Sequence, residues 1–514
     1  MNAPPNDSSP ARVSYADLMR RHGEVRDLAS AGGLLAWDQE TMMPRKGAAA
    51  RARQLAALAG IRHEKFTDPK VGELLAQCES SLAQFSDEEQ AQLRELRHDY
   101  DRATKIPGAL VQEFAAAESA ALEAWRDARQ KSSGATSEWK SFAPHLEKLL
   151  ALSKRKVAIL GFADRPYDGL LDDYERGATE ASLVQLFADL RRELAPLVAA
   201  VLGRRDRVDA SCARHRLDEE KQAQFGLDVI RSMGFDLDGG RVDRATHPFC
   251  SGLALGDTRL TRRFDPDDLR PALYGIVHEA GHGLYEQGLP AALDGTPLGE
   301  ACSLGIHEAQ SRLWENIVGR SLPFWRHFLP RLQLRFPAEF RDATPIGMWR
   351  AVNEVKASLI RVEADELTYN LHVLLRFELE RALMKGELTV ADVPAAWNAK
   401  STELLGITPT NDAEGCLQDI HWSMGALGYF PTYTLGNLYS AQLYEAARRA
   451  LPGLEAGFER GEFAPLREWL RVNVHQHGRR WLPAELIERA TGEKPSSAAF
   501  LRYLRAKCSA IYGV

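Results

Sequence analysis

Apolar residues recur at intervals of three and four along most of the 514-residue chain. This spacing is typical of amphipathic helices that bury one face. We therefore predict a mainly α-helical protein. The pattern predicts helices over Tyr15–Ser30, Gly47–Gly60, Asp87–Ala103, Gly108–Lys131, Ser137–Leu160, Thr179–Leu202, Asp218–Met233, Leu304–Gly319 and Met348–Lys385.

The pattern changes between Phe235 and Phe264, where glycine and proline separate short runs. Gly252–Leu255 and Arg259–Arg263 are predicted to be short strands of a small sheet. The segment Gly288–Gly299 contains glycine and proline and most resembles a hinge. No linker divides the chain. We expect residues 1–12 to form a disordered tail and residues 13–514 to form a single catalytic domain.

Composition and charge exclude several classes of protein. The net charge is only −6, with acidic and basic residues interspersed, so we expect no nucleic-acid partner. No apolar run is long enough to cross a bilayer, and the N-terminus does not resemble a signal peptide. The six cysteines are scattered without a CxxC pair, which indicates free thiols and a cytoplasmic protein.

The sharpest motif is His278-Glu279-Ala280-Gly281-His282. In a helix, residues four apart lie on one face, so both imidazoles can reach one ion. Glu279 points about 100° away and can act on a water molecule beside the metal. The sequence thus predicts a zinc site with Glu279 as the catalytic base.

The surrounding residues favour a helix for this motif. Asp265 is predicted to cap it, Pro266 suits the first turn, and Asp268 stands at the third position. Gly288 is a credible end of the helix.

Catalytic zinc usually has three protein ligands and one open position. The predicted helix Leu304–Gly319 carries His307-Glu308. Glu308 is the better third ligand, because two histidines and one glutamate form a common hydrolytic set. His307 is the alternative.

Several further motifs occur in a characteristic order along most of the chain. They are His247-Pro248-Phe249; Asp257, Arg259 and Thr261; the HEAGH motif; His307-Glu308-Ala309-Gln310; Ile360-Arg361 with Ala364 and Asp365; Gly415 with Gln418-Asp419 and His421-Trp422; and the N-terminal Trp37-Asp38-Gln39-Glu40-Thr41 with Pro44. Together they resemble the carboxypeptidase Taq family of metallocarboxypeptidases. Ala309 departs from the serine more usual in that family.

The resemblance implies a bilobed, saddle-like helical fold with a deep groove and a small sheet near the metal. It also implies homodimers that remove single residues from peptide C-termini with broad specificity. The implied cofactor is one Zn²⁺ held by His278, His282 and Glu308, and Co²⁺ or Mn²⁺ could substitute. The implied substrates are peptides with a free C-terminal carboxylate.

Two further charged residues are expected to support the metal site and to bind substrate. Asp257 is expected to accept a hydrogen bond from a ligand imidazole, although it could simply be a turn residue. Arg361 is expected to bind the substrate carboxylate, because its planar fork makes paired hydrogen bonds. The alternative for Arg361 is an intrahelical ion pair with Asp365.

The tetrahedral intermediate needs hydrogen-bond donors for its oxyanion. The resemblance points to His421 and Tyr429 as these donors, with Tyr433 as the reserve donor. Tyr433 is also expected to bind substrate. His247 is expected to line the substrate pocket or to be structural beside Pro248.

Two other functions use the same features. An endo-acting oligopeptidase could share the chemistry, and blocked peptides would distinguish it. A non-catalytic protein with structural zinc is the second alternative, but such sites are usually rich in cysteine.

Overall fold

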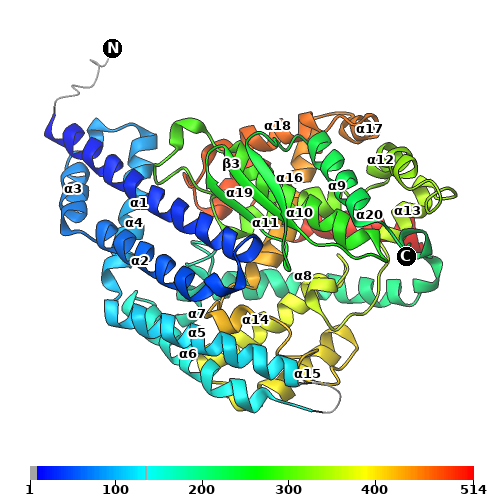
Figure 1. The fold of residues 1–514 in the computed structure, drawn as a ribbon, viewed down its shortest axis with the longest axis horizontal. Helices are drawn as coiled ribbons and strands as arrows, with labels where there is room; N and C mark the ends of the chain where they lie inside the picture. Colours follow the sequence, from blue (N-terminus) through cyan, green and yellow to red (C-terminus); the bar gives the residue numbers. More distant parts are fainter. Residues whose placement is uncertain (1–8, 133–135) are drawn as a thin grey trace.

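The computed structural model describes residues 9–132 and 136–514, and most of them are helical (Figure 1). The prediction of a mainly α-helical protein is confirmed. The helices are α1 (Pro10–Thr41), α2 (Ala48–Phe66), α3 (Pro69–Glu79), α4 (Asp87–Lys105), α5 (Gly108–Lys131), α6 (Trp139–Ile159), α7 (Pro166–Leu171), α8 (Glu180–Leu202), α9 (Glu219–Met233), α10 (Leu269–Gly288), α11 (Leu304–Arg312), α12 (Leu322–Arg335), α13 (Pro345–Val352), α14 (Tyr369–Lys385), α15 (Val393–Leu405), α16 (Pro431–Ala450), α17 (Leu454–Arg460), α18 (Ala464–Asn473), α19 (Pro483–Thr491) and α20 (Ala498–Tyr512).

Helix α1 is longer than the predicted Tyr15–Ser30. It begins at Pro10 because the Ser9 side chain caps it, accepting a hydrogen bond from the N–H of Arg12. The helix therefore starts inside the expected tail, and residues 1–8 lie outside the part of the chain that is described.

The predicted helix Met348–Lys385 is wrong. Helices α13 and α14 are separate, with only a short turn at Arg361–Glu363 in the segment between them. The Asp365 carboxylate accepts hydrogen bonds from the backbone N–H groups of Leu367 and Thr368, at 3.0 Å each. Such side-chain bonds compete with helical backbone bonds and stabilise an irregular path.

The small sheet contains strands β1 (Gly240–Arg244), β2 (Cys250–Ala254) and β3 (Asp257–Arg262), in the order β1-β3-β2. β1 is parallel to β3, and β2 is antiparallel to it. The two predicted strands overlap β2 and β3, whereas β1 was not predicted as a separate strand.

Two glycines let the sheet lie close to α10. A Cβ on Gly283 of α10 would lie 3.1 Å from the Leu260 side chain of β3. A Cβ on Gly252 of β2 would lie 2.2 Å from the carboxylate of Glu286 in α10. A larger residue would have to displace these side chains, so the two glycines help the sheet to pack close to the helix.

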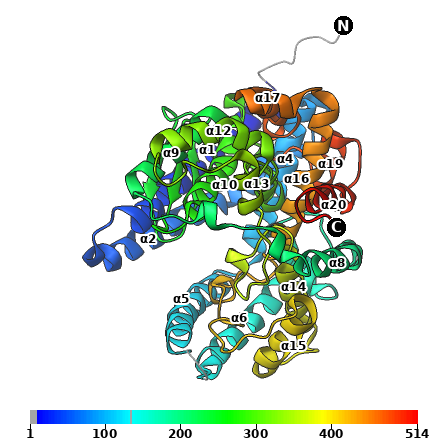
Figure 2. The same cartoon turned by 90° about the vertical axis from the view of Figure 1, so that its right-hand side faces the viewer.

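Two lobes are visible in Figure 2, with α5, α6, α14 and α15 in the lower one and α1, α9, α10 and α12 in the upper one. One hydrophobic core includes side chains from Ala121 to Tyr512. Helices α1, α3 and α4 share a smaller cluster that includes Leu18, Leu75 and Leu96. Within the described ranges, no helix has the length and apolar character that spanning a bilayer requires.

Candidate metal centre and substrate site

Helix α10 carries the two metal-site histidines. Its N-cap is Asp268, whose carboxylate accepts a hydrogen bond from the N–H of Arg270 at 2.8 Å. The predicted cap, Asp265, is therefore wrong, and Pro266 lies before the helix, whereas the predicted end at Gly288 is confirmed. Three residues between the cap and the metal site, Leu269, Leu273 and Val277, are buried.

Helix α11 brings the third ligand against α10. Oε2 of Glu308 lies 3.8 Å from Nε2 of His278 and 3.5 Å from Nε2 of His282. One ligand atom from each of the three residues lies within 4.8 Å of the others. Two imidazoles and one carboxylate match the donor set of a catalytic zinc site. Glu308, not His307, completes this group.

Gly281 explains how the two helices approach so closely. A Cβ at this position would lie 2.6 Å from Cα of Ser311 and 2.8 Å from the carbonyl oxygen of Gln310. Both contacts are with the backbone, which cannot rotate away. The glycine inside HEAGH therefore allows α11 to place Glu308 beside the histidines.

A carboxylate orients the first histidine. Nδ1 of His278 lies 2.9 Å from Oε2 of Glu315, so its Nε2 is directed toward Glu308. Glu315 lies in a wide π-helical segment, Leu313–Val318, that continues α11. The expectation that Asp257 fills this role is wrong, because its carboxylate is paired with Arg259 at 2.8 and 2.9 Å.

The second histidine is held through His307. Nδ1 of His282 contacts Nδ1 of His307, and Nε2 of His307 lies 2.7 Å from the Glu286 carboxylate. If His307 donates its Nε2–H to Glu286, its Nδ1 must accept from His282. That tautomer leaves the Nε2 lone pair of His282 directed at the metal position.

The charge of Arg312 keeps Glu308 ionised. Nε of Arg312 donates a 2.6 Å hydrogen bond to Oε1 of Glu308, which leaves Oε2 for an ion. Burial alone would raise the pKa of Glu308, but Arg312 and the two ligand imidazoles lower it below its ordinary value. Arg312 also stacks on the ring of Tyr369 at 4.4 Å.

Glu279 lies in the same buried region, with 6% of the residue exposed. Burial raises its pKa to about 7, and the charge of Glu308 also raises it. A carboxylate with such a pKa is suited to exchange a proton near neutral pH.

Arg361 is anchored by another carboxylate. Its Nε and Nη2 donate to Oδ1 of Asp419 at 3.0 and 2.8 Å, and its Nη1 donates to the Tyr369 hydroxyl at 2.6 Å. The alternative pair with Asp365 is excluded, since Arg361 lies outside any long helix. Five N–H groups are available, so one on each Nη remains for a substrate carboxylate.

The other predicted residues gather beside Arg361. Nε2 of His421 lies 3.0 Å from the Tyr433 hydroxyl, and the Tyr429 ring centroid lies 5.1 Å from that of His421. The Arg361 guanidinium lies 4.7 Å from the Tyr433 ring centroid. Burial and the charge of Arg361 lower the pKa of His421 to about 3, so its imidazole is neutral.

Helix α16 joins this cluster to the metal site. It carries Tyr433 and, three residues later on the same face, Gly436. A Cβ on Gly436 would lie 2.5 Å from Cγ of Glu308, so only glycine allows this approach. Burial raises the pKa of Tyr429 to about 12, and the charge of Glu308 contributes.

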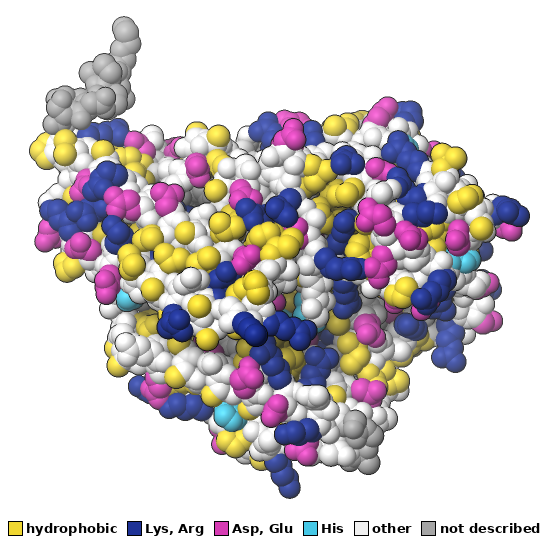
Figure 3. All heavy atoms as spheres, viewed as in Figure 1, with side chains coloured by type: hydrophobic (Ala, Val, Ile, Leu, Met, Phe, Trp, Pro, Cys, Tyr) yellow, Lys and Arg dark blue, Asp and Glu magenta, His cyan; other side chains and the backbone are white. Residues whose placement is uncertain are grey.

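His247 stands apart from these contacts. It is exposed in the loop between β1 and β2. The neighbouring Pro248 lies 3.9 Å from the position of a Cβ on Gly275, one turn before His278. The molecular surface is hollowed between the two lobes, and Lys and Arg side chains gather around the hollow (Figure 3).

A helical fold with HExxH on one helix and a glutamate ligand from the next defines a metallopeptidase. The sequence matches the carboxypeptidase Taq (M32) metallopeptidase family over residues 17–508. The chain belongs to this family, and it is a carboxypeptidase, a hydrolase of peptide bonds.

Individual relatives cover nearly the whole chain. It is 46% identical to thermostable carboxypeptidase 1 of Thermus thermophilus over 513 residues, covering 98% of this chain and 99% of that protein. It is 39% identical to carboxypeptidase 1 of Bacillus subtilis, covering 97% and 98%. The crystal structure of an M32 carboxypeptidase from Deinococcus radiodurans superposes with a TM-score of 0.94 at 43% identity, covering 98% and 100%.

The sequence reasoning missed Glu315, Arg312, Asp419 and Tyr369. A signal existed for the first two, because Glu308, Arg312 and Glu315 have the i, i+4, i+7 spacing of one helix face. Asp419 and Tyr369 had no such signal, since tertiary contacts alone bring them to Arg361.

Proposed function

We propose that this chain is a zinc carboxypeptidase that removes single residues from peptide C-termini with broad specificity. The observation that carries the proposal is the convergence of His278, His282 and Glu308 on one face, with Glu279 beside them. When bound there, a divalent ion supplies Lewis acidity, which polarises a carbonyl group and acidifies water. Zn²⁺ is the ion that this donor set favours, although Co²⁺ or Mn²⁺ could occupy it.

Glu279 is the proposed proton carrier. Its carboxylate accepts a proton from the attacking water and returns it to the leaving amine. Glu279→Gln should keep the metal stoichiometry of the wild type and lose turnover, by roughly 10²–10⁴-fold if general base catalysis is its role. Metal analysis and peptide hydrolysis check this together, and an active Gln variant would refute the assignment.

His421 and Tyr429 are the proposed oxyanion donors, with Tyr433 orienting His421 and contacting substrate. The neutral state of His421 supports this, because its other nitrogen, Nδ1, is buried and has no hydrogen-bond partner among residues 9–132 and 136–514. Loss of one such donor typically costs about 10²–10³ in kcat. His421→Ala and Tyr429→Phe should each lower kcat more than they raise KM.

Arg361 is proposed to bind the C-terminal carboxylate of the substrate. Support comes from its two N–H groups that remain beyond Asp419 and Tyr369, and from the aromatic rings that pack on its guanidinium. Wild-type enzyme should shorten a free peptide stepwise and leave its C-terminal amide intact, as followed by mass spectrometry. Equal cleavage of both would instead favour an endo-acting oligopeptidase.

We further propose that residues 13–514 act as one catalytic unit in a cytoplasmic homodimer, with His247 at the rim of the substrate pocket. All six cysteines are free, which fits a reducing compartment. The core that extends from Ala121 to Tyr512 supports a single unit. Light scattering on the purified protein tests whether it forms a dimer. His247→Ala should alter KM alone if His247 contacts substrate.

A further inference from the structure

A carboxylate is buried behind the proposed oxyanion donors. Glu380 of α14 is 0% exposed. Its Oε2 accepts hydrogen bonds from the Tyr167 hydroxyl at 2.8 Å and from the N–H of Gly428 at 3.0 Å. Its Oε1 accepts from the indole Nε1 of Trp422 at 2.8 Å. A buried carboxylate is costly to maintain, so three converging donors mark a site built for it.

Two of these donors lie next to the catalytic candidates in the sequence. Trp422 follows His421, and Gly428 precedes Tyr429. One side chain therefore bonds to the segment immediately after the first candidate and immediately before the second. The Trp422 ring is held further by an edge-to-face contact with Trp397 at 5.9 Å.

Gly428 has no side chain, so Glu380 binds it through its backbone N–H. Its φ is +84°, which side chains rarely tolerate, and a Cβ there would lie 2.7 Å from Cβ of Leu170. Its N–H points to Glu380 instead of into a helix, because it precedes α16. The direction in which the chain enters Tyr429 thus depends on that carboxylate.

Helix α14 also contacts Asp419, two residues before His421, through a different residue. Arg376, one turn before Glu380 and on the same face, donates from Nε to Oδ2 of Asp419 at 2.6 Å. Oδ1 of Asp419 binds Arg361. The anchor of the substrate carboxylate therefore rests on Arg376, whereas the segment around His421 and Tyr429 rests on Glu380.

We propose that Glu380 is a positioning residue that sets His421 and Tyr429 for oxyanion stabilisation. This inference rests on the proposed function of those two residues. Among the described residues, the hydrogen bonds of Glu380 go to Tyr167, Trp422 and Gly428 and not to the metal ligands, so its effect must pass through the segment Trp422–Gly428. Because Arg361 is held separately, disturbing Glu380 should weaken transition-state binding and leave ground-state binding of the substrate intact.

Glu380→Gln is the direct test, with Glu378→Gln as the matched control on the same helix. Glutamine keeps one acceptor oxygen and turns an N–H₂ group toward a donor, so at least one of the three bonds is lost. A misplacement of about 1 Å can cost about 10²-fold in rate, so we expect kcat to fall roughly 10–100-fold. KM for free peptides and bound metal per chain should match the wild type. Glu378, which pairs with Lys400 and Arg191 near the surface, should tolerate the change.

A double-mutant cycle separates positioning from general destabilisation. If Glu380 acts through His421 and Tyr429, then Glu380→Gln should lower kcat by a smaller factor in the Tyr429→Phe background than in the wild type. A merely structural role predicts the same fractional loss in both backgrounds, together with loss of bound metal, and would overturn the proposal. Unchanged kcat in Glu380→Gln would overturn it as well.

A second pair of variants serves if Glu380→Gln does not fold. Trp422→Phe removes only the bond to Oε1, whereas Trp139→Phe removes an indole hydrogen bond, to the carbonyl oxygen of Val390, that does not involve Glu380. The first should lower kcat at unchanged KM, and the second should not; equal effects would refute the inference. If His421→Ala and Tyr429→Phe themselves leave kcat unchanged, the oxyanion assignment fails instead.

Discussion

Gly281→Ala is the substitution in which one methyl group should disrupt the metal centre. The added Cβ would lie 2.6 Å from Cα and 3.0 Å from the backbone nitrogen of Ser311 in α11. Cβ atoms do not approach backbone atoms so closely, so the helices must separate by about 1 Å to restore ordinary contact near 3.5–4.0 Å. Glu308 moves with α11, away from His278 and His282.

The magnitude follows from two opposing effects. Alanine in place of a mid-helix glycine stabilises by about 1 kcal/mol. Overpacking in a close-packed interior costs typically 1–3 kcal/mol, and the backbone contact here belongs at the top of that range. We expect a net loss of about 1–2 kcal/mol in stability, and metal binding at least about 10-fold weaker, as when a supporting contact of a ligand is lost.

Gly275→Ala on the same helix is the matched control. The nearest atom to a Cβ there is Cγ of Pro248 at 3.9 Å, an ordinary van der Waals distance. This variant should be as stable as the wild type or more stable, with unchanged metal affinity. Thermal unfolding with and without zinc, and competition with a chelator, measure both quantities. If Gly281→Ala matches Gly275→Ala in both assays, the argument from helix contact is refuted.

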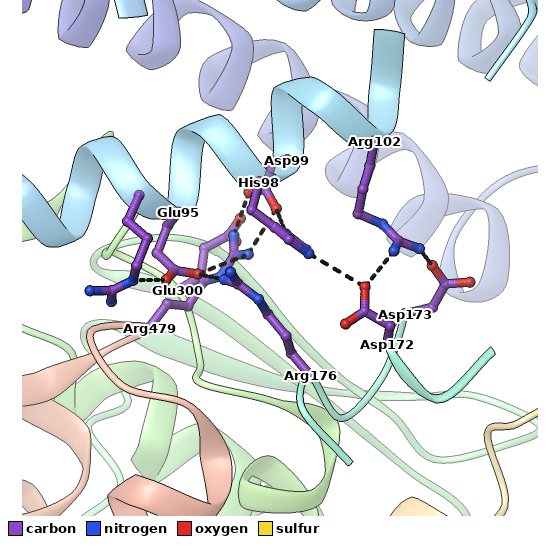
Figure 4. A network of polar contacts seen from close by, with 10 residues as sticks. Glu95, His98, Asp99, Arg102, Asp172, Asp173, Arg176, Glu300 and Arg479 are labelled. Carbon is purple, nitrogen blue, oxygen red and sulfur yellow. Dashed lines mark hydrogen bonds and ion pairs between the residues drawn. The ribbon is translucent and has the colours of Figure 1, made fainter. Parts of the chain in front are cut away.

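Three further predictions concern residues outside the motif. His307→Ala should weaken metal binding about 10–100-fold by chelator competition, because His282 loses its Nδ1 partner. Arg312→Met should destabilise the metal-free protein by about 3–5 kcal/mol and the zinc-loaded protein by less, because the ion can neutralise Glu308 in place of Arg312. His98 in α4 bridges Asp99 and Asp172 within the ion-pair network of Figure 4, and hydrogen bonds to these carboxylates raise its pKa above 6.5. Its stabilising effect is therefore full below pH 6.5 and lost as pH rises through the raised pKa, so wild type and His98→Gln should differ most in thermal midpoint near pH 5–6 and least near pH 9.

The metal site could be predicted because local spacing determines it. Two histidines four residues apart share a helix face in any helix, and His307-Glu308 lay in the next predicted helix. Asp257 was expected to accept a hydrogen bond from a ligand imidazole because it belongs to one of the motifs that resemble the family. In the structure Asp257 pairs with Arg259, and Glu315 contacts His278 instead.

The segment around Arg361 was predicted wrongly as part of one long helix. Apolar periodicity continues through it, which predicted one long helix, but Gln418 accepts a hydrogen bond from the N–H of Arg361 at 2.9 Å. That contact comes from a residue 57 positions away. Tertiary bonds of this kind override local propensity, and no window of the sequence reveals them.

Side-chain contacts also connect the two halves of the site, and residue spacing in the sequence does not predict them. Arg361 donates to the hydroxyl of Tyr369, the guanidinium of Arg312 stacks on the same ring, and Arg312 bonds to Glu308. The proposed carboxylate anchor and the metal ligand thus share one tyrosine. Tyr369 begins α14, the helix that also carries Arg376 and Glu380, so this helix contacts both halves of the site. If Arg361 binds the substrate carboxylate as proposed, these contacts through Tyr369 would help to fix the distance between the bound C-terminus and the metal.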